Sequence, residues 1–277
     1  MSGAGEFSVG FWGVRGSIAC PGEDTVRYGG NTACLEVRCG EHLLIFDAGT
    51  GIRRLGRKLA AQAPLDFDLF LTHSHYDHIS GIPFFAPVFD PRNTMRLWAG
   101  HLEKDRTLRS VIQDMMTAPL FPVPLEVFVA RCSFHEFACG ATLTPKPGVT
   151  LRTGPLVHPN NACGYRIEYN GKAACYVTDT EHTPGQLDAR VLALIEGADV
   201  LIYDSTYTDE EFFRYKGWGH STWQECCRIA EAAHVKTAVI FHHDPSHDDD
   251  FMDAVAQEAA LMRPGTLVAQ EGMVLKL

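Results

Sequence analysis

The sequence of 277 residues lacks any apolar run long enough to span a bilayer, and its first residues contain neither the basic nor the apolar segment of a secretion signal. It also lacks a Cys-x-x-Cys pair, and its nine cysteines are odd in number and scattered. These absences predict a protein without membrane contact. They favour reduced thiols in the cytoplasm over a framework of disulfides.

Basic residues are few. The 24 lysines and arginines are outnumbered by 34 aspartates and glutamates, which gives a formal net charge of −10. This charge argues against wide electrostatic contact with extended nucleic acid. A small anionic ligand remains compatible with it, because bound dications would reverse the sign of the charge inside a pocket.

Linkers, low-complexity segments and internal repeats are absent as well. Apolar residues make up 45% of the chain and charged residues 21%, which is ordinary for a globular protein with a sizeable core. We therefore expect a single domain over residues 1–277.

The pattern of apolar residues predicts a mixed α/β protein. Strand patterns lie at 7–12, 32–38, 41–47, 67–71, 94–99, 125–130, 134–137, 149–157, 163–169, 173–178, 198–203, 237–241 and near the end of the chain. Helical patterns lie at 52–62, from about 80–83, and at 101–117, 187–195, 221–233 and 249–262. Two sheets between helices fit this order better than one parallel doubly wound sheet.

The densest polar motif follows the apolar strand at 67–71. Residues 72–78 read Thr-His-Ser-His-Tyr-Asp-His, which places His73, His75, Asp77 and His78 within six positions. A strand end is a rigid platform, and His73 and His75 face the same side of an extended chain. Imidazole and carboxylate together suit Zn²⁺, Mn²⁺ or Fe²⁺. Four ligands in two pairs predict two adjacent metals, whereas a loop of helix-capping histidines is the alternative.

Polar residues also stand at the ends of other expected strands. They are Asp47, His158, Asp179 and the pair His242-His243. Taken singly, a histidine at a strand end is more often a hydrogen-bonded structural residue, and an aspartate before threonine is more often a turn or helix cap. Their recurrence at strand ends favours a shared site. The remaining histidines are expected at the surface or in structural roles: His42, His101, His182, His234 and His247.

These motifs together resemble the metallo-β-lactamase fold superfamily. The resemblance rests on His-x-His-x-Asp-His at 73–78 with His158, Asp179 and His242, and it spans nearly the whole chain. It implies a four-layer αββα sandwich in which two mixed sheets are covered by helices and two divalent metals lie at one edge. Zn²⁺ is the expected metal, with Mn²⁺ or Fe²⁺ as alternatives.

The resemblance also implies a role for each ligand. One metal would be held by His73, His75 and His158, and the other by Asp77, His78 and His242. Asp179 would bridge the two metals together with a hydroxide. His242 is preferred to His243 because it directly follows the strand. Asp47 would steady the ligand loop from behind.

The bridging residue narrows the class that the resemblance implies. Asp179 is a carboxylate, as in the binuclear hydrolases of this superfamily. A β-lactamase of this fold often has a cysteine ligand and lacks the histidine at position 78, and the His-x-Glu-x-Asp motif of the diiron flavoproteins is absent. Redox chemistry is therefore not expected.

Two further segments resemble tRNase Z and its phosphodiesterase relatives. Residues 203–207 read Tyr-Asp-Ser-Thr-Tyr and residues 219–222 read Gly-His-Ser-Thr. By this resemblance, Asp204 orients His220, which would donate to the scissile phosphate or protonate the leaving alkoxide. With Asp77, these two residues are the predicted catalytic residues. The alternative is that His220 caps the helix that begins at Ser221.

The N-terminal segments Val14-Arg15-Gly16-Ser17 and Arg27-Tyr28-Gly29-Gly30-Asn31-Thr32 look like a signature of phosphodiesterase-like members, some of them suggested to act on cyclic nucleotides. Arg15 could reach a phosphate, while Asn31 and Thr32 could support the metal loop. Arg15, Asn31 and His220 are the predicted substrate-binding residues. Strand-joining turns with a solvated arginine are the alternative.

One absence bears on the substrate. The Gly- and Pro-rich arm with which tRNA-processing enzymes grip tRNA has no counterpart here, and this makes tRNA a less favoured substrate. The prolines at 118–124 exclude regular structure there. The neighbouring aromatic residues either wall a pocket, where they could stack on a base, or belong to the core: Phe121, Phe128, Phe134 and His135.

We therefore expect a cytoplasmic binuclear metallohydrolase that cleaves a small-molecule phosphodiester, with a small cyclic nucleotide as the favoured substrate. Alternatives are hydrolysis of a carboxylic ester, lactone or thioester, RNA 3′-processing, and a non-catalytic nucleotide sensor. A homodimer is compatible with this fold, although the sequence contains no interface signal.

Overall fold

The computed structural model describes residues 5–103 and 105–277. The expectation that no secretion signal is present rests partly on residues 1–4, which lie outside the described residues. Among the helices of the described part, none combines the length and the apolar character that a membrane crossing requires.

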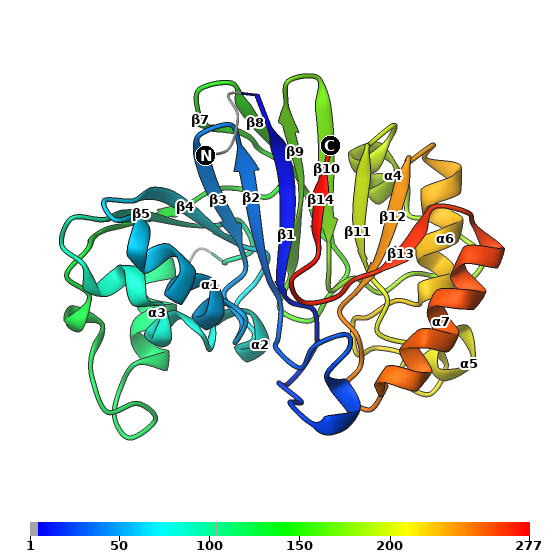
Figure 1. Cartoon of the computed structure of the whole chain (residues 1–277), viewed down its shortest axis with the longest axis horizontal. Coiled ribbons are helices and arrows are strands. Elements are labelled where there is room, and N and C mark those ends of the chain that lie inside the picture. The colour runs from blue at the N-terminus through cyan, green and yellow to red at the C-terminus, as the bar shows by residue number, and fades with distance from the viewer. Residues whose placement is uncertain (1–4, 104) are drawn as a thin grey trace.

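Two seven-stranded sheets form the centre of the protein (Figure 1). The order in the first sheet is β14 (Val274–Lys276), β1 (Phe7–Gly13), β2 (Cys34–Cys39), β3 (His42–Phe46), β4 (Asp66–Leu71), β5 (Thr94–Ala99) and β6 (Arg131–Glu136). The order in the second is β7 (Thr142–Lys146), β8 (Val149–Leu156), β9 (Ala162–Tyr169), β10 (Lys172–Val177), β11 (Val200–Asp204), β12 (Thr237–Phe241) and β13 (Thr266–Val268). In these orders the pairs are antiparallel up to the fourth strand and parallel thereafter.

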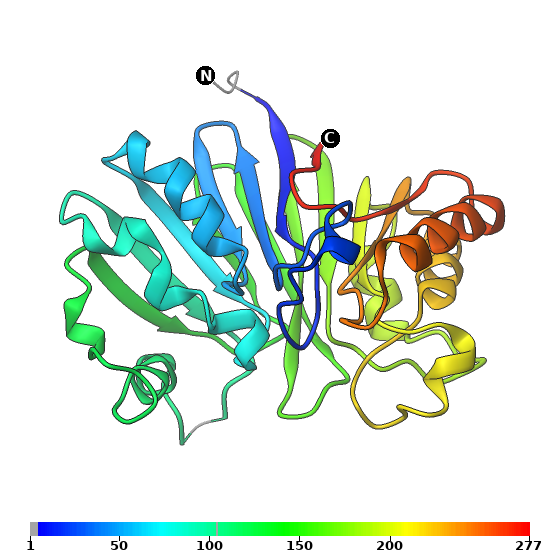
Figure 2. The same ribbon diagram turned by 60° about the horizontal axis from the view of Figure 1, so that its bottom comes forward.

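Helices cover the outer face of each sheet (Figures 1 and 2). The α-helices are α1 (Ile52–Leu59), α2 (Tyr76–Ile79), α3 (Leu108–Met115), α4 (Ala189–Ile195), α5 (Asp209–Phe212), α6 (Trp223–Ala232) and α7 (Asp249–Met262). Short 3₁₀ turns lie at Glu23–Thr25, Ala60–Gln62, Ile82–Phe84, Ala86–Phe89 and Leu125–Val127. Helices α1 and α3 lie against the first sheet, and α4, α6 and α7 lie against the second. The predicted αββα sandwich is confirmed.

Alternation along the strands divides the apolar residues among three cores. In β3, Leu44 and Phe46 face the core between the two sheets, whereas Leu43 and Ile45 face the core beneath α1. In β11 the alternate residues likewise divide between the inter-sheet core and the core beneath α6. Because successive side chains of a strand point to opposite faces, the central strands are buried on both sides. The ends of such strands are rigid positions for functional side chains.

Two helix predictions differ from the structure. The helix predicted at 101–117 begins only at Leu108, because Thr107 is its N-cap and accepts a hydrogen bond from the amide of Ser110. The helix predicted to begin near 80–83 is wrong, because the 3₁₀ turns Ile82–Phe84 and Ala86–Phe89 lie there instead. Helix α2 ends before this segment, and it places Asp77 and His78 in a helix and not in a loop.

The strand predicted at 125–130 is wrong. Pro124 begins a 3₁₀ turn there, and its carbonyl accepts a hydrogen bond from the amide of Val127. Strand β7, which was not predicted, contains Pro145 and lies at the edge of its sheet, where a residue without an amide proton is tolerated. The single domain over residues 1–277 stays a prediction; the pairing of β1 with β14 joins the two ends of the chain in one sheet.

Phe46 provides a test of the inter-sheet core. Its ring lies 5.3 Å from that of Phe70 and 5.2 Å from that of Tyr165, measured between centroids, and it is fully buried. Phe46→Ala is expected to lower the free energy of unfolding by about 3–5 kcal/mol, because it leaves a cavity that the sheets cannot fill. Urea denaturation measures this value. The exposed Leu261→Ala on α7 is the control, and equal midpoints for the two variants would contradict the assignment.

Candidate metal centre

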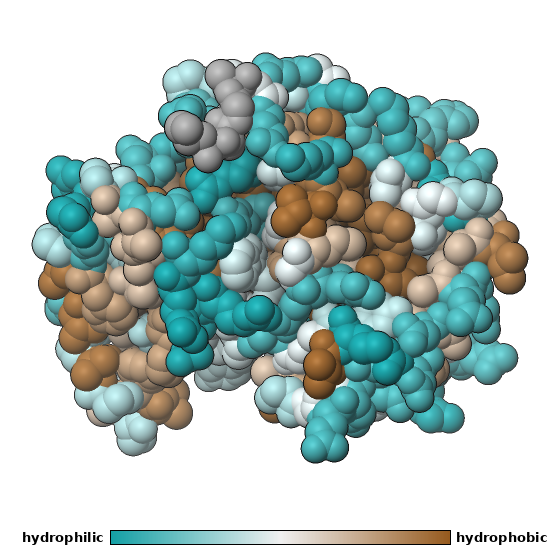
Figure 3. All heavy atoms as spheres, viewed as in Figure 1, coloured by the Kyte–Doolittle hydropathy of each residue, from teal (hydrophilic) through white to brown (hydrophobic). Residues whose placement is uncertain are grey.

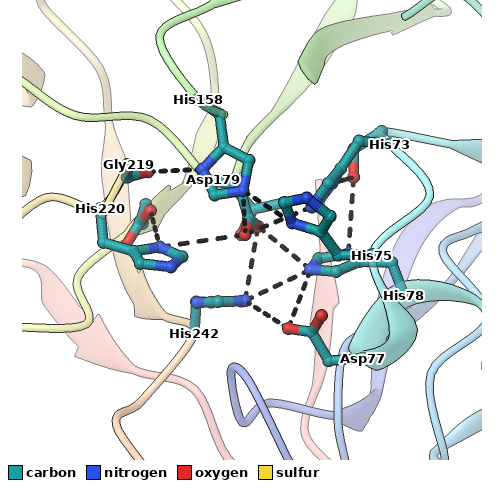
Figure 4. A network of polar contacts seen from close by, with 12 residues as sticks. His73, His75, Asp77, His78, His158, Asp179, Gly219, His220 and His242 are labelled. Carbon is teal, nitrogen blue, oxygen red and sulfur yellow. Dashed lines mark hydrogen bonds and ion pairs between the residues drawn. The ribbon is translucent and has the colours of Figure 1, made fainter. Parts of the chain in front are cut away.

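The ends of several strands converge at the edge of the sandwich where α2 lies (Figure 1). His73 and His75 follow β4, His158 follows β8, Asp179 follows β10 and His242 follows β12. Helix α2 adds Asp77 and His78. Figure 4 shows these seven side chains pointing toward one another. The structure therefore brings together every residue that was predicted as a metal ligand.

Three strand-end residues of the site have left-handed backbone conformations. The φ angles are 58° at Asp47, 59° at Asp179 and 65° at His242. Side chains other than glycine seldom adopt this region, and such residues gather at functional sites that the surrounding structure holds in place. The turn redirects each side chain after its strand ends, which lets residues of different strands meet.

One group of four ligand atoms has the spacing of a tetrahedral metal site. The Nε2 atom of His78 lies 3.3 Å from Asp77 Oδ2, 3.2 Å from Asp179 Oδ2 and 3.3 Å from His242 Nε2. His242 Nε2 lies 3.3 Å and 3.4 Å from the same two carboxylate oxygens. Ligand atoms bound tetrahedrally to Zn²⁺ lie about 3.4 Å from one another, so these residues fit such an ion.

A second group lies directly beside the first. His158 Nε2 is 3.0 Å from His75 Nδ1, and both His158 Nε2 and His73 Nε2 are 3.7 Å from Asp179 Oδ1. His73 Nε2 is buried and has no hydrogen-bond partner among the described residues. A buried nitrogen without a partner fits a metal ligand. Asp179 directs one oxygen toward each group, which supports its predicted role as the shared ligand.

The second ring nitrogen of each histidine has its own partner. These contacts are His73 Nδ1 with Thr72 Oγ1 at 3.1 Å, His75 Nε2 with Asn160 Oδ1 at 3.2 Å, His78 Nδ1 with Asp47 Oδ2 at 2.8 Å, His158 Nδ1 with the Gly219 carbonyl at 2.8 Å, and His242 Nδ1 with Thr206 Oγ1 at 3.0 Å. Such partners orient metal-binding imidazoles and select their tautomer.

Asp47 holds the ligand loop from behind. Besides contacting His78, its carboxylate accepts hydrogen bonds from the amide and hydroxyl of Thr72 and from the hydroxyl of Tyr176. It is fully buried. This geometry supports the supporting role predicted for Asp47, because it joins the end of β3, the ligand loop and the second sheet.

The charges of the cluster favour a bound cation. Burial raises the pKa of the Asp179 carboxyl, but His242, His78 and His73 outweigh it and hold this pKa well below its usual value. Burial likewise opposes the charge on His78, yet Asp179, Asp77 and Asp47 raise the pKa of His78. The carboxylates therefore stay ionised and attract positive charge. A bound metal would supply this charge in place of protons.

His242 and His243 point in opposite directions. His242 lies in the cluster, whereas His243 Nε2 lies 2.9 Å from the carbonyl of Ala269 and its ring meets the ring of Tyr28 edge-on. The geometry thus places His242, as preferred, beside the other candidate ligands.

The predicted contact of Arg15 with a phosphate is not supported. Arg15 is fully buried, and its guanidinium donates to the carbonyls of Gly29, Asp244 and His247 at 2.8, 3.1 and 2.6 Å. The side chain therefore joins loops of the first and second sheets. The solvated arginine considered as the alternative is also wrong, because the side chain has no access to solvent.

The neighbours of Arg15 lie directly against two of the candidate metal ligands. The amide of Ser17 donates to Asp77 Oδ2 at 2.7 Å. A Cβ atom on Gly16 would lie 2.3 Å from the ring of His242, so only glycine fits. Asn31 donates from its side chain to both carboxylate oxygens of Glu271 at 3.1 Å, which leaves it a structural contact in this arrangement.

Asp204 and His220 form the predicted pair beside the cluster. His220 Nδ1 lies 2.9 Å from Asp204 Oδ2, and the His220 ring lies 5.1 Å from the His158 ring between centroids (Figure 4). Burial lowers the pKa of His220, but Asp204 outweighs it, aided by Asp179, and raises the pKa to about 9. The alternative role as a helix cap is wrong, because the N-cap of α6 is Thr222.

His101 lies closer to the centre than the sequence indicated. It follows β5, its Nε2 lies 3.1 Å from Ser74 Oγ, and its ring lies 6.5 Å from that of His73. Burial lowers the pKa of His101 to about 4. Its place after an expected strand is the available signal, but a single histidine at a strand end more often has a structural role.

The aromatic residues near the proline-rich segment belong largely to the core. Phe121, Phe128 and Phe134 pack against the core beneath α1 and α3, and the His135 ring stacks on Trp98 at 4.2 Å. Figure 3 shows apolar side chains gathered on the surface over α3 and the segment after it, where Leu120 is 71% exposed.

Residues 42–243 match the beta-lactamase superfamily domain, and this range covers most of the chain. The chain belongs to this superfamily. The family assignment made from the histidine and aspartate motifs is therefore confirmed.

Individual relatives agree with this family. A protein named Ribonuclease Z from Gemmatimonas aurantiaca is 28% identical over 293 residues, which cover 90% of each chain. The crystal structure of the metallo-beta-lactamase fold protein YhfI from Bacillus subtilis has a TM-score of 0.74 at 18% identity, covering 99% of this chain and 100% of that one. Zn²⁺-bound PqqB from Methylobacterium extorquens has a TM-score of 0.72 at 18% identity, with 98% and 100% covered.

Asp179→Ala tests the shared ligand. Because Asp179 faces both ligand groups, the variant is expected to lose metal and activity together, with the bound metal falling below two equivalents per chain. Elemental analysis after dialysis against Zn²⁺ measures this ratio. Asp90→Ala, which removes a surface ion pair with Arg92, should retain the wild-type ratio. Two equivalents in Asp179→Ala would contradict a shared ligand.

Gly16→Ala tests the close contact with His242. The added methyl group would displace the imidazole, and we expect the affinity for the metal bound there to fall about 10–100-fold, as when an orienting contact of a ligand is lost. Competition with a chromogenic chelator measures the affinity. Gly10→Ala, whose Cβ would meet nothing closer than 3.8 Å, is the control. Equal affinities in both variants would show that His242 does not need this space.

Proposed function

We propose that this superfamily hydrolase is a binuclear metal-dependent phosphodiesterase. The observation that carries the proposal is the Asp204–His220 pair beside two groups of metal-ligating side chains that share Asp179. Metal ligands alone would serve any hydrolase of the family, whereas this pair adds an oriented proton donor within reach of the same substrate.

The ligand groups would position the reaction. His73, His75 and His158 would hold one divalent ion, Asp77, His78 and His242 the other, and Asp179 both. When bound, two dications would polarise the phosphoryl oxygens and lower the pKa of a water molecule beside them. Zn²⁺ suits the donor set best, with Mn²⁺ or Fe²⁺ as alternatives.

His220 would act on the leaving group. Asp204 is anchored by hydrogen bonds from the amides of Thr180 and Thr206 at 3.0 and 3.1 Å, and it therefore holds the Nδ1 side of the His220 ring in place. Nε2 of His220 then carries the proton that can pass to the departing oxygen or be shared with a phosphoryl oxygen. Asp204 itself does not touch the substrate and acts by orienting His220.

A small cyclic nucleotide is the first substrate that we propose. The net charge of −10 disfavours a long polyanion, whereas a single phosphodiester meets the positive charge of the metals. RNA 3′-processing is the second candidate, because the relatives that match most of the chain are named Ribonuclease Z. The cytoplasmic location, the absence of a membrane partner and the possible homodimer stay predictions.

Hydrolysis of a carboxylic ester, lactone or thioester would use the same metals. In such a reaction the Asp204–His220 pair would lack an evident role. Assays of the Zn²⁺-loaded protein with bis(p-nitrophenyl) phosphate, 2′,3′-cyclic and 3′,5′-cyclic nucleotides, cyclic dinucleotides, short RNA and a lactone separate the candidates. Turnover of the lactone without turnover of any phosphodiester would overturn the proposal.

His220→Ala tests the assigned proton donor. Because His220 is not part of either ligand group proposed here, metal content should stay at the wild-type value while kcat for a phosphodiester falls about 10²–10⁴-fold. Asp204→Asn should lower kcat in the same direction. His42→Ala, at the start of β3, is the control. Wild-type turnover in His220→Ala would remove this residue from the mechanism.

A further inference from the structure

The segment between α5 and His220 alternates aromatic and basic residues. Residues 213–218 read Phe-Arg-Tyr-Lys-Gly-Trp in a chain whose acidic residues outnumber its basic ones. Phe213 is 71% exposed and Trp218 is 61% exposed. Arg214 and Lys216 are also exposed, and neither forms an ion pair with a residue that the structure describes. We call this stretch the 213–218 segment.

Aromatic rings connect the 213–218 segment with the catalytic pair. The Trp218 ring meets the Tyr215 ring at 5.3 Å between centroids, and Tyr215 stacks on Tyr207 at 4.7 Å with an interplanar angle of 15°. The Tyr207 ring in turn meets the His220 ring edge-on at 6.0 Å. A row of rings thus leads from exposed Trp218 to buried His220.

Hydrogen bonds hold the end of the segment against the metal centre. The amides of Gly217 and Gly219 donate to Glu181 Oε2 at 2.7 and 3.0 Å, and both glycines have positive φ angles, 91° and 87°. The carbonyl of Gly219 contacts His158 Nδ1 at 2.8 Å. In Figure 2 the yellow chain around and after α5 lies on the side that comes forward, at the lower right. Trp218 is therefore held at the rim of the site.

Scattered exposed apolar residues are normal on a protein surface and need no function. The 213–218 segment differs because its two exposed aromatic side chains flank two cations that have no acidic partner among the described residues. Its last residue, Trp218, is two positions from the proposed proton donor. Exposed aromatic rings stack on nucleobases without regard to sequence, and nearby cations attract phosphate.

We propose that the 213–218 segment binds the nucleotide part of the substrate, with a nucleobase stacked on Trp218 and a second phosphate at Arg214 and Lys216. This inference rests on the proposed phosphodiesterase function and narrows it. A substrate that carries a base and a phosphate beyond the scissile one, such as a cyclic or linear dinucleotide, fits better than a simple alkyl or aryl diester.

Three chromogenic substrates with one leaving group separate these contributions. Methyl p-nitrophenyl phosphate has no base, thymidine 5′-(p-nitrophenyl phosphate) adds a base, and its 3′-phosphorylated form adds a second phosphate. For the Zn²⁺-loaded wild type we expect KM to fall at each addition. The base should lower KM about ten-fold, which is within the range that base stacking on an aromatic side chain contributes to binding in other proteins.

Substitutions should remove the two decreases in KM separately. Trp218→Ala should abolish the difference in KM between the methyl and thymidine substrates, while Trp218→Phe should retain most of it. The double variant Arg214→Ala/Lys216→Ala should abolish the further gain from the 3′-phosphate and weaken its dependence on salt. Leu261→Ala and Arg57→Ala are the exposed apolar and basic controls, and both should retain the two decreases in KM. Wild-type differences in the segment variants would overturn the proposal.

Binding without turnover distinguishes this inference from the proposed function. Thymidine 3′,5′-bisphosphate has a base and two phosphates but no diester, so it tests the segment alone. Its titration should quench the tryptophan fluorescence of the wild type saturably and that of Trp218→Phe far less. Quenching without cleavage of any diester would overturn the phosphodiesterase assignment and keep the nucleotide site. Cleavage of a diester without quenching that depends on Trp218 would keep the phosphodiesterase assignment and overturn the nucleotide site.

Discussion

The cluster of buried carboxylates and imidazoles is the arrangement on which the rest of this site depends. The Nε2 atoms of His78 and His242 lie 3.2–3.4 Å from each other and from one carboxylate oxygen each of Asp77 and Asp179. Ionised carboxylates so close together and so far from water are stable only with positive charge among them. Protons can supply this charge, but a divalent cation also matches the spacing of these four residues.

The two-sheet architecture is what allows this convergence. Each sheet changes from antiparallel to parallel pairing at its fourth strand, β3 in one sheet and β10 in the other. Asp47 and Asp179 follow these two strands, and both have left-handed backbone conformations. One carboxylate supports the ligand loop from behind and the other faces both ligand groups. The structure thus has a regularity that no repeat in the sequence revealed, because pairing depends on backbone geometry and not on residue identity.

The residues around the cluster are the ones that the proposed reaction adds to the common fold. Asp204 and His220 come from β11 and the loop before α6, and the 213–218 segment leads from the surface to His220. These residues lie outside the two ligand groups proposed here, so we expect that they can change without loss of the proposed metals. Under the proposed function, the strand ends supply the hydrolytic chemistry and the segment between α5 and α6 selects the substrate, in line with the general division between rigid scaffold and recognition loops.

The sequence by itself determined the superfamily, the αββα layers and the set of ligand candidates, because periodicity and ligand-rich motifs are local and survive without three-dimensional information. The tertiary structure decided which side chains point into the site. Arg15 stands in a motif that looked accessible, yet long-range contacts with the carbonyls of Asp244 and His247 bury it. His242 and His243 are adjacent and chemically identical, and the left-handed turn after β12 directs one toward the candidate ligands and the other into the core. The direction of these side chains depends on contacts between residues far apart in the chain, and a local sequence pattern carries no information about such contacts.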